Sequence, residues 1–494
     1  MRRLSKSRIL SYRQCPKRLW LEVHRPELRD DSSSQQAFAI GHQVGAIAHL
    51  VYDAEGHGTL IDIAALGHES ALALSAQLLA EGNGPIMEAG MTAEGALAYA
   101  DVMLPDRSDG TLRWKMVEVK AATSVKSYYH DDIAVQAYIA AHSGTPLSSI
   151  SIAHIDNRFV YQGDGKYQGL FREVDFTETA KSRFDEVRAW ICGAQETLAL
   201  TEEPDMATGP QCHTPFACPF HQHCHVAQES PAYPLSSLPD LRAPRLALIE
   251  AEGIKDLRHA PDHLLTAPQL RVKQCSIAEK PYFDAEGAAA DLASRGFPAY
   301  FLDFEAVQFS VPIWKGTSPY QPYPFQFSLH VVRENGEVTH HSFLDLSGND
   351  PRENFAQSLI ERCGMEGPVF AYNASYEASI MRRLAVHCPT HASGLRSIIA
   401  RLVDLLPIAK KRYYHPAQHG TWGLKSVLPA LCPDLSYADL GGVQDGRAAG
   451  NAYLEAIDPR TSPERKAQLE SELHDYCQLD TWAMVRIWQE FRGA

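Results

Sequence analysis

The sequence predicts a mixed α/β protein with two large domains and a small helical connector. Three observations predict this class. The chain has 494 residues, and a single hydrophobic core stops growing well before that length. Its residues are 45% hydrophobic and 21% charged, which is typical of a globular protein. Short apolar runs with strand character alternate with longer helical patterns, and this alternation favours helices and strands within one fold.

Clusters of proline mark the expected boundaries. The stretch SPAYPLSSLPDLRAP at 230–244 repeats proline between short apolar pieces, which is typical of a linker. We therefore expect a first domain at 1–230, a helical connector at 231–292 and a second domain at 293–494. The second domain begins with the buried-strand pattern FPAYFLDFEAV and ends with a helix, SELHDYCQLDTWAMVRIWQEF.

The composition also bears on location. No run approaches the roughly 18 uncharged apolar residues that a membrane span requires, so we expect no membrane partner. The basic start MRRLSKSRILSYRQCPKRLW lacks the apolar region of a signal peptide, which favours the cytoplasm. Thiols stay reduced there, so the ten cysteines argue for bound metal rather than for disulfides.

A net charge of −14 does not exclude a nucleic-acid partner, because phosphate contacts need only local basic residues. Nine Lys or Arg residues lie within 1–29, where the acids are Glu22 and Glu27. The run KKRYY at 410–414 places cations beside aromatic rings, which suits a phosphate backbone and unstacked bases. Either cluster taken alone is equally typical of a solvated face.

A β-hairpin is expected where ALAYADVMLP and LRWKMVEVKAAT flank the turn DRSDG. Its first strand carries Asp101 and its second carries Glu118 and Lys120. Residues two apart on a strand share a face, so the hairpin can bring the two carboxylates and the ammonium together. Paired carboxylates bind a divalent cation, and the ammonium can offset phosphate charge during phosphodiester hydrolysis. A lone E-x-K is usually a surface pair, but the apolar neighbours Met116, Val117 and Val119 argue for a buried strand.

The next helix, YYHDDIAVQAYIAAHSG, presents Gln136 and Tyr138, which we expect either to hold substrate or, for Tyr138 with equal weight, to pack in the core. The order Asp, Glu-x-Lys, Gln, Tyr resembles the PD-(D/E)XK nucleases of the RecB type. That resemblance implies a restriction-endonuclease-like fold and a Mg²⁺ or Mn²⁺ ion, with Glu88 as a further acidic metal ligand. The family often has a histidine in a G-x-x-x-H pattern, which we did not find around GHQVG, and His42 is not assigned that role.

Three cysteines recur at six-residue intervals in QCHTPFACPFHQHC, at Cys212, Cys218 and Cys224, and a fourth, Cys15, lies far upstream. One cysteine before a nuclease core and three after it resembles the iron–sulfur nucleases of the AddB and CRISPR-associated RecB-like groups. The resemblance implies that these four thiolates hold a [4Fe-4S] cluster that staples the domain, although two of the family's late cysteines are closer together. Zinc is the alternative, because histidines interleave with the thiols at His213, His221, His223 and His225.

Acidic residues also form three motifs in the second half. Asp303 and Glu305 lie two apart on an expected strand. Asn373 and Glu377 lie one turn apart at the start of an expected helix, as do Tyr476 and Asp480 on the last one. Asp404, in RLVDLLP, is expected to cap a helix rather than to reach the site.

In order, these motifs resemble the three exonuclease motifs of the DEDD superfamily, in its tyrosine-bearing branch. The resemblance implies an RNase H-like fold and two Mg²⁺ or Mn²⁺ ions held by Asp303, Glu305, Glu377 and Asp480, with Tyr476 positioning the attacking water. Glu377 departs from the usual aspartate. The segment YYHPAQHGTWGLKSVLPAL further resembles a bacterial family of unknown function that pairs the same two nuclease-like regions.

Together, these features predict a metal-dependent nuclease that cleaves DNA from single-stranded ends, with 3′–5′ exonuclease activity in the C-terminal half. RNA is an alternative substrate. Two other functions stay open at this point. The protein can be a nucleic-acid-binding module with only one active centre, or an iron–sulfur or zinc protein whose metal controls its activity.

Overall fold

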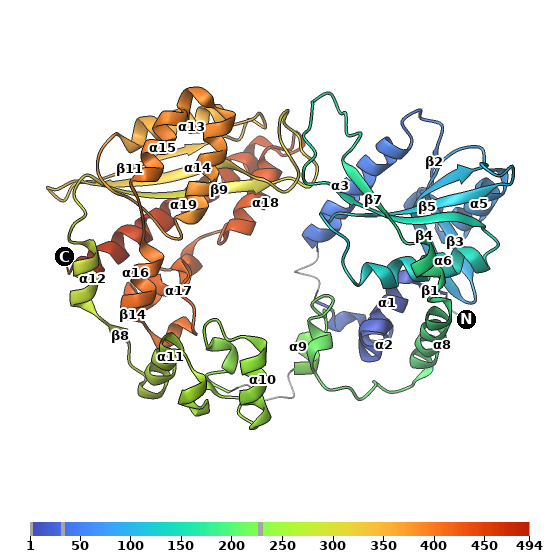
Figure 1. The fold of residues 1–494 in the computed structure, drawn as a ribbon, viewed down its shortest axis with the longest axis horizontal. Helices are drawn as coiled ribbons and strands as arrows, with labels where there is room; N and C mark the ends of the chain where they lie inside the picture. The colour runs from blue at the N-terminus through green and yellow to red at the C-terminus, as the bar shows by residue number, and fades with distance from the viewer. Residues whose placement is uncertain (1–2, 31–34, 226–230, 494) are drawn as a thin grey trace. The chain divides into compact units, whose positions relative to one another are not determined.

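The computed structural model describes residues 3–30, 35–225 and 231–493. The chain divides into two compact units. Unit 1 comprises residues 1–229 and 309–320, and unit 2 comprises 230–308 and 321–494. The expected connector at 231–292 therefore falls within unit 2. Both units combine helices with a β-sheet (Figure 1), which confirms the prediction of a mixed α/β protein.

Unit 1 is built around a seven-stranded sheet with the strand order β2-β3-β4-β5-β6-β7, to which β1 adds by pairing with β4. Its strands are β1 (Leu4–Ser5), β2 (Thr59–Leu60), β3 (Ile86–Ala93), β4 (Ala96–Asp106), β5 (Arg113–Lys120), β6 (Leu147–Ile155) and β7 (Phe171–Asp175). β4 and β5 form the expected antiparallel hairpin, in which Val102 pairs with Val117. β5 and β6 are parallel, so a crossover helix must connect them.

That crossover is α6, which packs its apolar side chains, among them Ile133 and Val135, with Met116 of β5 and Ile150 of β6. The helices of unit 1 are α1 (Lys6–Gln14), α2 (Pro16–His24), α3 (Gln35–Tyr52), α4 (Ile63–Leu66), α5 (His68–Glu81), α6 (Tyr129–His142), α7 (Thr177–Lys181), α8 (Phe184–Ala199) and α9 (His221–His225), with short 3-10 turns η1 (Pro26–Leu28) and η2 (Pro210–Cys212). Nearly all of α6 is buried. It is therefore the helix that brings polar groups onto one face of β5.

Unit 2 contains a five-stranded sheet in the order β11-β10-β9-β12-β13. The strands are β9 (Ala299–Gln308), β10 (Pro322–Val332), β11 (Val338–Leu344), β12 (Val369–Ala371) and β13 (Leu402–Asp404), and a separate ribbon pairs β8 (Tyr282–Phe283) with β14 (Tyr413–Tyr414). β9 lies in the middle of the sheet, antiparallel to β10 and parallel to β12. Its central position explains why its sequence is so apolar.

Helices cover both faces of this sheet. They are α10 (Ala243–Ala251), α11 (Ala267–Ala278), α12 (Ala285–Leu292), α13 (Arg352–Cys363), α14 (Ser375–His387), α15 (Ala392–Ala400), α16 (Leu405–Arg412), α17 (Leu424–Leu431), α18 (Gly446–Ala456) and α19 (Pro463–Arg492), with 3-10 turns η3 (Leu235–Ser237), η4 (Leu257–His259), η5 (Asp262–Leu264), η6 (Pro389–His391), η7 (Pro416–Gln418) and η8 (Tyr437–Asp439). Side chains of α13, α14 and α15 pack with Leu302 on one face, and Figure 1 shows these three helices gathered beside the sheet. Phe301, on the opposite face, packs with Trp488 of α19. Because strand faces alternate, Asp303 and Glu305 share the face of Phe301, toward α19.

Two smaller features complete the fold. The segment 309–320, which follows β9, belongs to unit 1, where Val311 packs with Val44 and Ile155. Among the described residues, no helix combines the length and the apolar character needed to cross a membrane.

Candidate functional site

In unit 1, the hairpin brings together the residues that its sequence predicted. Glu118 is buried and accepts a hydrogen bond from the Lys120 ammonium at 2.6 Å between Nζ and Oε1. Asp101 lies beside them, because its Oδ2 accepts from the backbone N–H of Val119 at 2.6 Å. Two carboxylates and an ammonium therefore share one small region of the sheet.

α6 adds two more polar side chains on the same face. Gln136 is fully buried, and its Nε2 donates to Glu118 Oε2 at 2.6 Å. Asp132, one turn earlier, pairs with Lys120. Tyr138 does not reach this cluster, because positions two apart lie on different sides of a helix. Its hydroxyl donates to Glu94 and accepts from Arg188, and its side chain is buried, which is the second of the two positions expected for it.

A second ammonium comes from the beginning of α1. Lys6 Nζ lies 2.8 Å from Glu118 Oε1 and 2.9 Å from Asp132 Oδ1, and its side chain is only 19% exposed. The sequence offered no local signal for Lys6, because it is 112 positions from Glu118. Asp132 was recognisable, since an acid one helical turn before Gln136 must lie on the same face.

In this cluster, the positive charges of two lysines compensate part of the negative charge of the acids. Burial opposes ionisation of Asp132, yet Lys120 and Lys6 hold the pKa of its carboxyl well below the ordinary range. Burial also acts to lower the pKa of Lys6, but Asp132 and Glu118 raise it above its usual value. The pKa of Asp101 is raised well above its ordinary value, first by burial and then by the charge of Glu118. A bound cation would favour the ionised form of Asp101.

Glu88 and His49 form the outer part of the cluster. Glu88 has a positive φ of 58° on β3, a conformation that non-glycine residues adopt rarely. Burial and then Glu118 raise the pKa of Glu88. His49 Nε2 lies 4.0 Å from Glu88 Oε1. Gly45 and His49 form a G-x-x-x-H pattern on α3, so the expectation that this pattern is missing is wrong.

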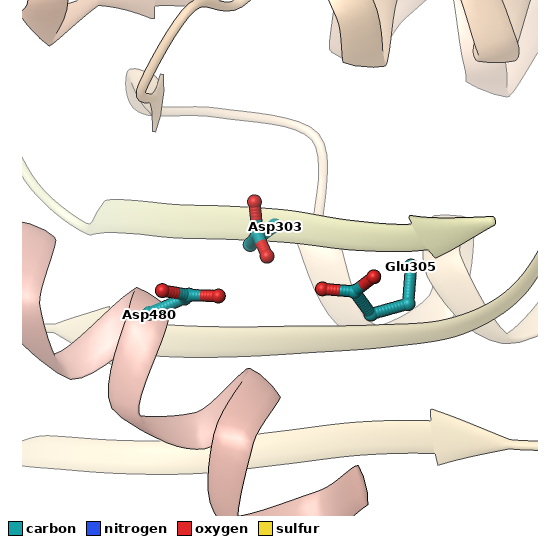
Figure 2. Close-up of side chains that lie close together, drawn as sticks. All are labelled: Asp303, Glu305 and Asp480. Carbon is teal, nitrogen blue, oxygen red and sulfur yellow. The ribbon is translucent and has the colours of Figure 1, made fainter. Parts of the chain in front are cut away.

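In unit 2, three predicted carboxylates converge. Asp303 and Glu305 point from β9 toward Asp480 of α19 (Figure 2). One oxygen of each lies within 4.8 Å of the others. Among the residues that the structure describes, no other group of three or more metal-ligating side chains lies so close together. Such a spacing lets carboxylate oxygens share divalent cations.

Glu377, the fourth predicted acid, lies at the start of α14 and contributes to the charge that raises the pKa of Asp303. Its side chain is buried, and Oε2 has no hydrogen-bond partner among the described residues. A buried carboxylate oxygen without a partner is costly. Glu377 therefore fits the role of a metal ligand, although it stands outside the closest group of three.

Uncompensated charge dominates this cluster. Burial, followed by Asp480, raises the pKa of Glu305 to about 8. Burial likewise raises the pKa of Glu377 to about 8 and that of Asp480 to about 6. The pKa of Asp303 is raised well above its ordinary range by burial and then by Asp480 and Glu305. The four acids oppose one another's ionisation, and bound cations would relieve that repulsion.

Two tyrosines and a lysine border the same acids. Tyr476, as predicted, lies one turn before Asp480 on α19 and is buried. Tyr437 of η8 was not predicted, and its hydroxyl donates to Asp480 Oδ1 at 2.5 Å. The Lys425 ammonium lies 4.8 Å from the ring centroid of Tyr476 and 5.2 Å from that of Tyr437. Lys425 acts to lower the pKa of Glu305 against burial and Asp480, so it is the cation of this cluster.

Asp404 has the capping role that its sequence predicted. Its Oδ1 accepts from the backbone N–H of Leu406 at 3.0 Å, which caps α16. The same oxygen accepts from the N–H of Asn373 at 3.0 Å, where φ is 74°. Asp404 thus holds the turn that precedes α14 and Glu377.

The aromatic half of KKRYY is not available to bases. Tyr413 and Tyr414 are 3% and 1% exposed and pack in the core of unit 2. Arg412 is paired with Asp284 and Asp291. The expectation that these rings stack on bases is wrong, because β14 places both of them inside.

The four predicted cysteines line a single cavity in unit 1. They are far apart in sequence, and η2, α9 and the α1–α2 junction bring them together at Cys15, Cys212, Cys218 and Cys224. All four are free thiols. Burial raises the pKa of Cys218, with Arg18 acting in the opposite direction. Burial raises the pKa of Cys224 in the same way, opposed by Lys17. Arg18 and Lys17 lie close enough to stabilise thiolates at these positions, so the four sulfur atoms fit a metal ion or an iron–sulfur cluster.

The interleaved histidines take different positions. His221 also lines the cavity, and its ring stacks near those of His213 and His225, at centroid distances of 4.9 and 5.2 Å. His223 does not line the cavity and contacts Glu203, with 3.3 Å between Nε2 and Oε1. The histidine that zinc coordination would use from this set is therefore His221.

Comparison with known families places part of the chain. Residues 300–423 match the model of a family described as Domain of unknown function (DUF2779). The matched region includes Asp303, Glu305 and Glu377 and ends before Tyr476. No curated protein matches the chain. Over residues 300–423 the chain is thus similar to a family whose function is uncharacterised.

Proposed function

We propose that the protein is a metal-dependent nuclease with a PD-(D/E)XK-like centre in unit 1 and an RNase H-like, DEDD-type centre in unit 2. The observation that carries this proposal is the convergence of Asp303, Glu305 and Asp480, with one oxygen of each within 4.8 Å of the others. The raised pKa values of these acids add to it. Such a cluster is stable when divalent cations neutralise it.

Mg²⁺ or Mn²⁺ bound in unit 2 would polarise the scissile phosphate and supply a hydroxide. Asp303, Glu305, Glu377 and Asp480 would hold the ions. Tyr476, next to Asp480, orients the attacking water through its hydroxyl, and Lys425 lies where it can meet the negative charge of the phosphate. The roles of the four acids and of Tyr476 are those that the sequence motifs imply, and the role of Lys425 comes from its position in the structure.

In unit 1, Glu88, Asp101 and Glu118 would hold the metal, with His49 as a fourth ligand at the edge. Lys120 offsets the charge that develops on the phosphate. Gln136 keeps Glu118 in place through its 2.6 Å hydrogen bond. Orientation of a carboxylate by a buried neighbour is what a metal ligand requires.

The cavity formed by Cys15, Cys212, Cys218 and Cys224 is proposed to hold a [4Fe-4S] cluster, with zinc as the alternative. Either would join the beginning of unit 1 to its end and contribute binding free energy to folding. The expected substrate is DNA with a single-stranded end, because an unpaired strand can bring its phosphate backbone to the acids without a second strand in the way. RNA is the second candidate.

The proposal is tested with Lys120→Met and Asp303→Asn, separately and together, on 3′- and 5′-labelled single-stranded and duplex DNA and on RNA of the same sequence. Lys115→Met is the matched control on β5, since Lys115 forms a partly exposed pair with Glu173. Asp434→Asn is the control in unit 2, since Asp434 pairs with Arg486. Each active-site variant is expected to remove one cleavage activity and the double variant both. Cleavage that survives in the double variant at the wild-type rate overturns the assignment.

A further inference from the structure

α1 connects two centres of unit 1 that the sequence keeps apart. Its first residue, Lys6, lies in the carboxylate cluster, and Cys15, which directly follows its last residue, lies in the thiol cavity. Nine helical residues span about 13 Å. A helix of this length is rigid, so a displacement at one end moves the other.

At its beginning, α1 presents Lys6 to two acids at once. The Nζ atom lies 2.8 Å from Glu118 and 2.9 Å from Asp132. Glu118 and Asp132 side chains are 3% and 10% exposed. A bridge between two nearly buried acids differs from a surface ion pair, because neither partner can turn to water when it breaks.

At its end, α1 is fastened to the cysteine-bearing loop. The Gln14 Nε2 donates to the carbonyl of Gln211 at 2.7 Å and to that of Phe216 at 2.8 Å. Gln211 directly precedes Cys212. The position of the end of α1 therefore depends on this loop, and a metal or cluster bound by the cysteines would order the loop.

Charge balance indicates what Lys6 does in the cluster. Four acids, Glu88, Asp101, Glu118 and Asp132, bring a formal charge of −4, and Lys6 and Lys120 bring +2. The remainder of −2 suits a single divalent ion. Without Lys6 the remainder is −3, which binds a divalent cation more strongly and no longer holds Glu118 and Asp132 in one arrangement.

We propose that Lys6 is a positioning residue of the unit 1 site, that its charge lowers the affinity of this site for a divalent ion, and that the cysteine centre sets its position through α1. Lys6 acts through Glu118 and Asp132 and not by contact with substrate. The inference rests on the proposed function only in calling the site catalytic, because metal binding tests it without cleavage.

The first experiment measures Mn²⁺ affinity by calorimetry in an Asp303→Asn, Asp480→Asn background, which removes the metal ligands of unit 2. Lys6→Met is expected to tighten Mn²⁺ binding roughly tenfold, because it removes one positive charge from a poorly solvated site. Lys6→Arg, which keeps the charge, is expected to restore the affinity to within about twofold. Arg8→Met removes a charge from the same helix and serves as the control. A purely structural Lys6 predicts unchanged or weaker Mn²⁺ binding in Lys6→Met, and that result overturns the role.

The second experiment tests the connection through α1. Cys15→Ala, with iron and zinc content measured, is expected to tighten Mn²⁺ binding in the same direction as Lys6→Met. Gln14→Ala leaves all four thiols in place and removes two hydrogen bonds to the loop, so it decides the question if Cys15→Ala fails to fold. Combined with Lys6→Met, either change is expected to add nothing further, which a double-mutant cycle measures. Additive or absent effects overturn the connection.

These readouts separate the inference from the proposed function. If the wild-type chain cleaves no nucleic acid and the Mn²⁺ shifts still appear, the proposed function fails and the role of Lys6 stands. If cleavage depends on Lys120 and Lys6→Met leaves the Mn²⁺ affinity unchanged, the inference fails and the proposed function stands.

Discussion

The carboxylate clusters of the two units contain the same number of acids and differ in what balances them. In unit 1, Lys6 and Lys120 pair with Glu118 and Asp132 at hydrogen-bond distance. In unit 2, four acids face one lysine, Lys425, whose ammonium stacks over tyrosine rings and donates to the Gln444 carbonyl. The unit 1 cluster is stabilised by its own lysines, whereas the unit 2 cluster keeps negative charge that the proposed function assigns to bound cations.

Under the proposed function, this difference separates two ways of building a metal site. Internal ion pairs fix the side chains of unit 1 before any metal binds, which reduces the reorganisation that binding requires. The acids of unit 2 repel one another, and a bound divalent cation would relieve this repulsion. The formal charge of the unit 1 cluster is −2, which one divalent ion balances. That of the unit 2 cluster is −3, which one divalent ion leaves unbalanced, and the sequence motifs imply two ions there.

The largest expected effect is in unit 1. Glu118→Gln removes the carboxylate that both buried lysines contact, and the loss of one partner of a buried pair costs about 3 to 5 kcal/mol. Chemical unfolding at pH 7 measures this change. Glu173→Gln, which affects the partly exposed pair with Lys115, is the control and is expected to cost less than about 1 kcal/mol. Equal costs for the two variants would contradict a compensated cluster.

Removal of an acid from unit 2 is expected to have the opposite sign. The folded pKa of Asp303 is raised by burial and by Asp480, so the folded state binds its proton more tightly than the unfolded state. The contribution of Asp303 to stability is therefore greatest below pH 4 and is lost as the pH rises through the folded pKa. Asp303→Asn is expected to stabilise the metal-free chain at pH 8, and this stabilisation is expected to vanish near pH 4. Asp434→Asn provides the control, and destabilisation of Asp303→Asn at pH 8 would contradict the repulsion.

Metal affinity should depend on pH in unit 2. Burial raises the pKa of Glu305 and of Glu377 to about 8, so below pH 8 an incoming ion must displace protons. Mn²⁺ binding to unit 2 is expected to weaken about tenfold for each pH unit between 8 and 6. A Glu88→Gln, Asp101→Asn variant, which removes two of the proposed ligands of unit 1, isolates this titration. An affinity that stays constant over this range would show that the acids are already ionised.

The smallest expected effect concerns Lys425. Its ammonium is only half-buried and lies over aromatic rings rather than against a carboxylate. Lys425→Met is therefore expected to change Mn²⁺ affinity in unit 2 about threefold, less than the roughly tenfold change for Lys6→Met in unit 1. Calorimetry under the same conditions compares the two. A larger change for Lys425→Met would mean that Lys425 balances the acids more directly than its position indicates.

The residues that sequence could predict are those whose spacing maps directly onto one element. Alternation along β9 placed Asp303 beside Glu305, and the hairpin register placed Asp101 near Glu118. The helical repeat placed Tyr476 one turn from Asp480. Asp404 was predicted as a cap because an acid after a short strand and before a helix suits that role.

Residues contributed by elements that are distant in the sequence could not be predicted from spacing within one element. Lys6 reaches Glu118 only because β1 pairs with β4 and sets the beginning of α1 against the sheet. Tyr437 reaches Asp480 from a 3-10 turn 43 positions away. The G-x-x-x-H pattern of Gly45 and His49 was present in the sequence and was overlooked. Tyr413 and Tyr414 were misjudged because the short ribbon with β8 that buries them leaves no periodic signal.

The most direct test of the difference between the two clusters is the number of Mn²⁺ ions bound per chain at pH 8, counted by calorimetry and by electron paramagnetic resonance. The wild-type chain is expected to bind three. Asp303→Asn with Asp480→Asn is expected to lose two of them, and Glu88→Gln with Asp101→Asn to lose one. Loss of a single ion in the unit 2 variant, or of two in the unit 1 variant, would contradict the assignment of charge made to each cluster.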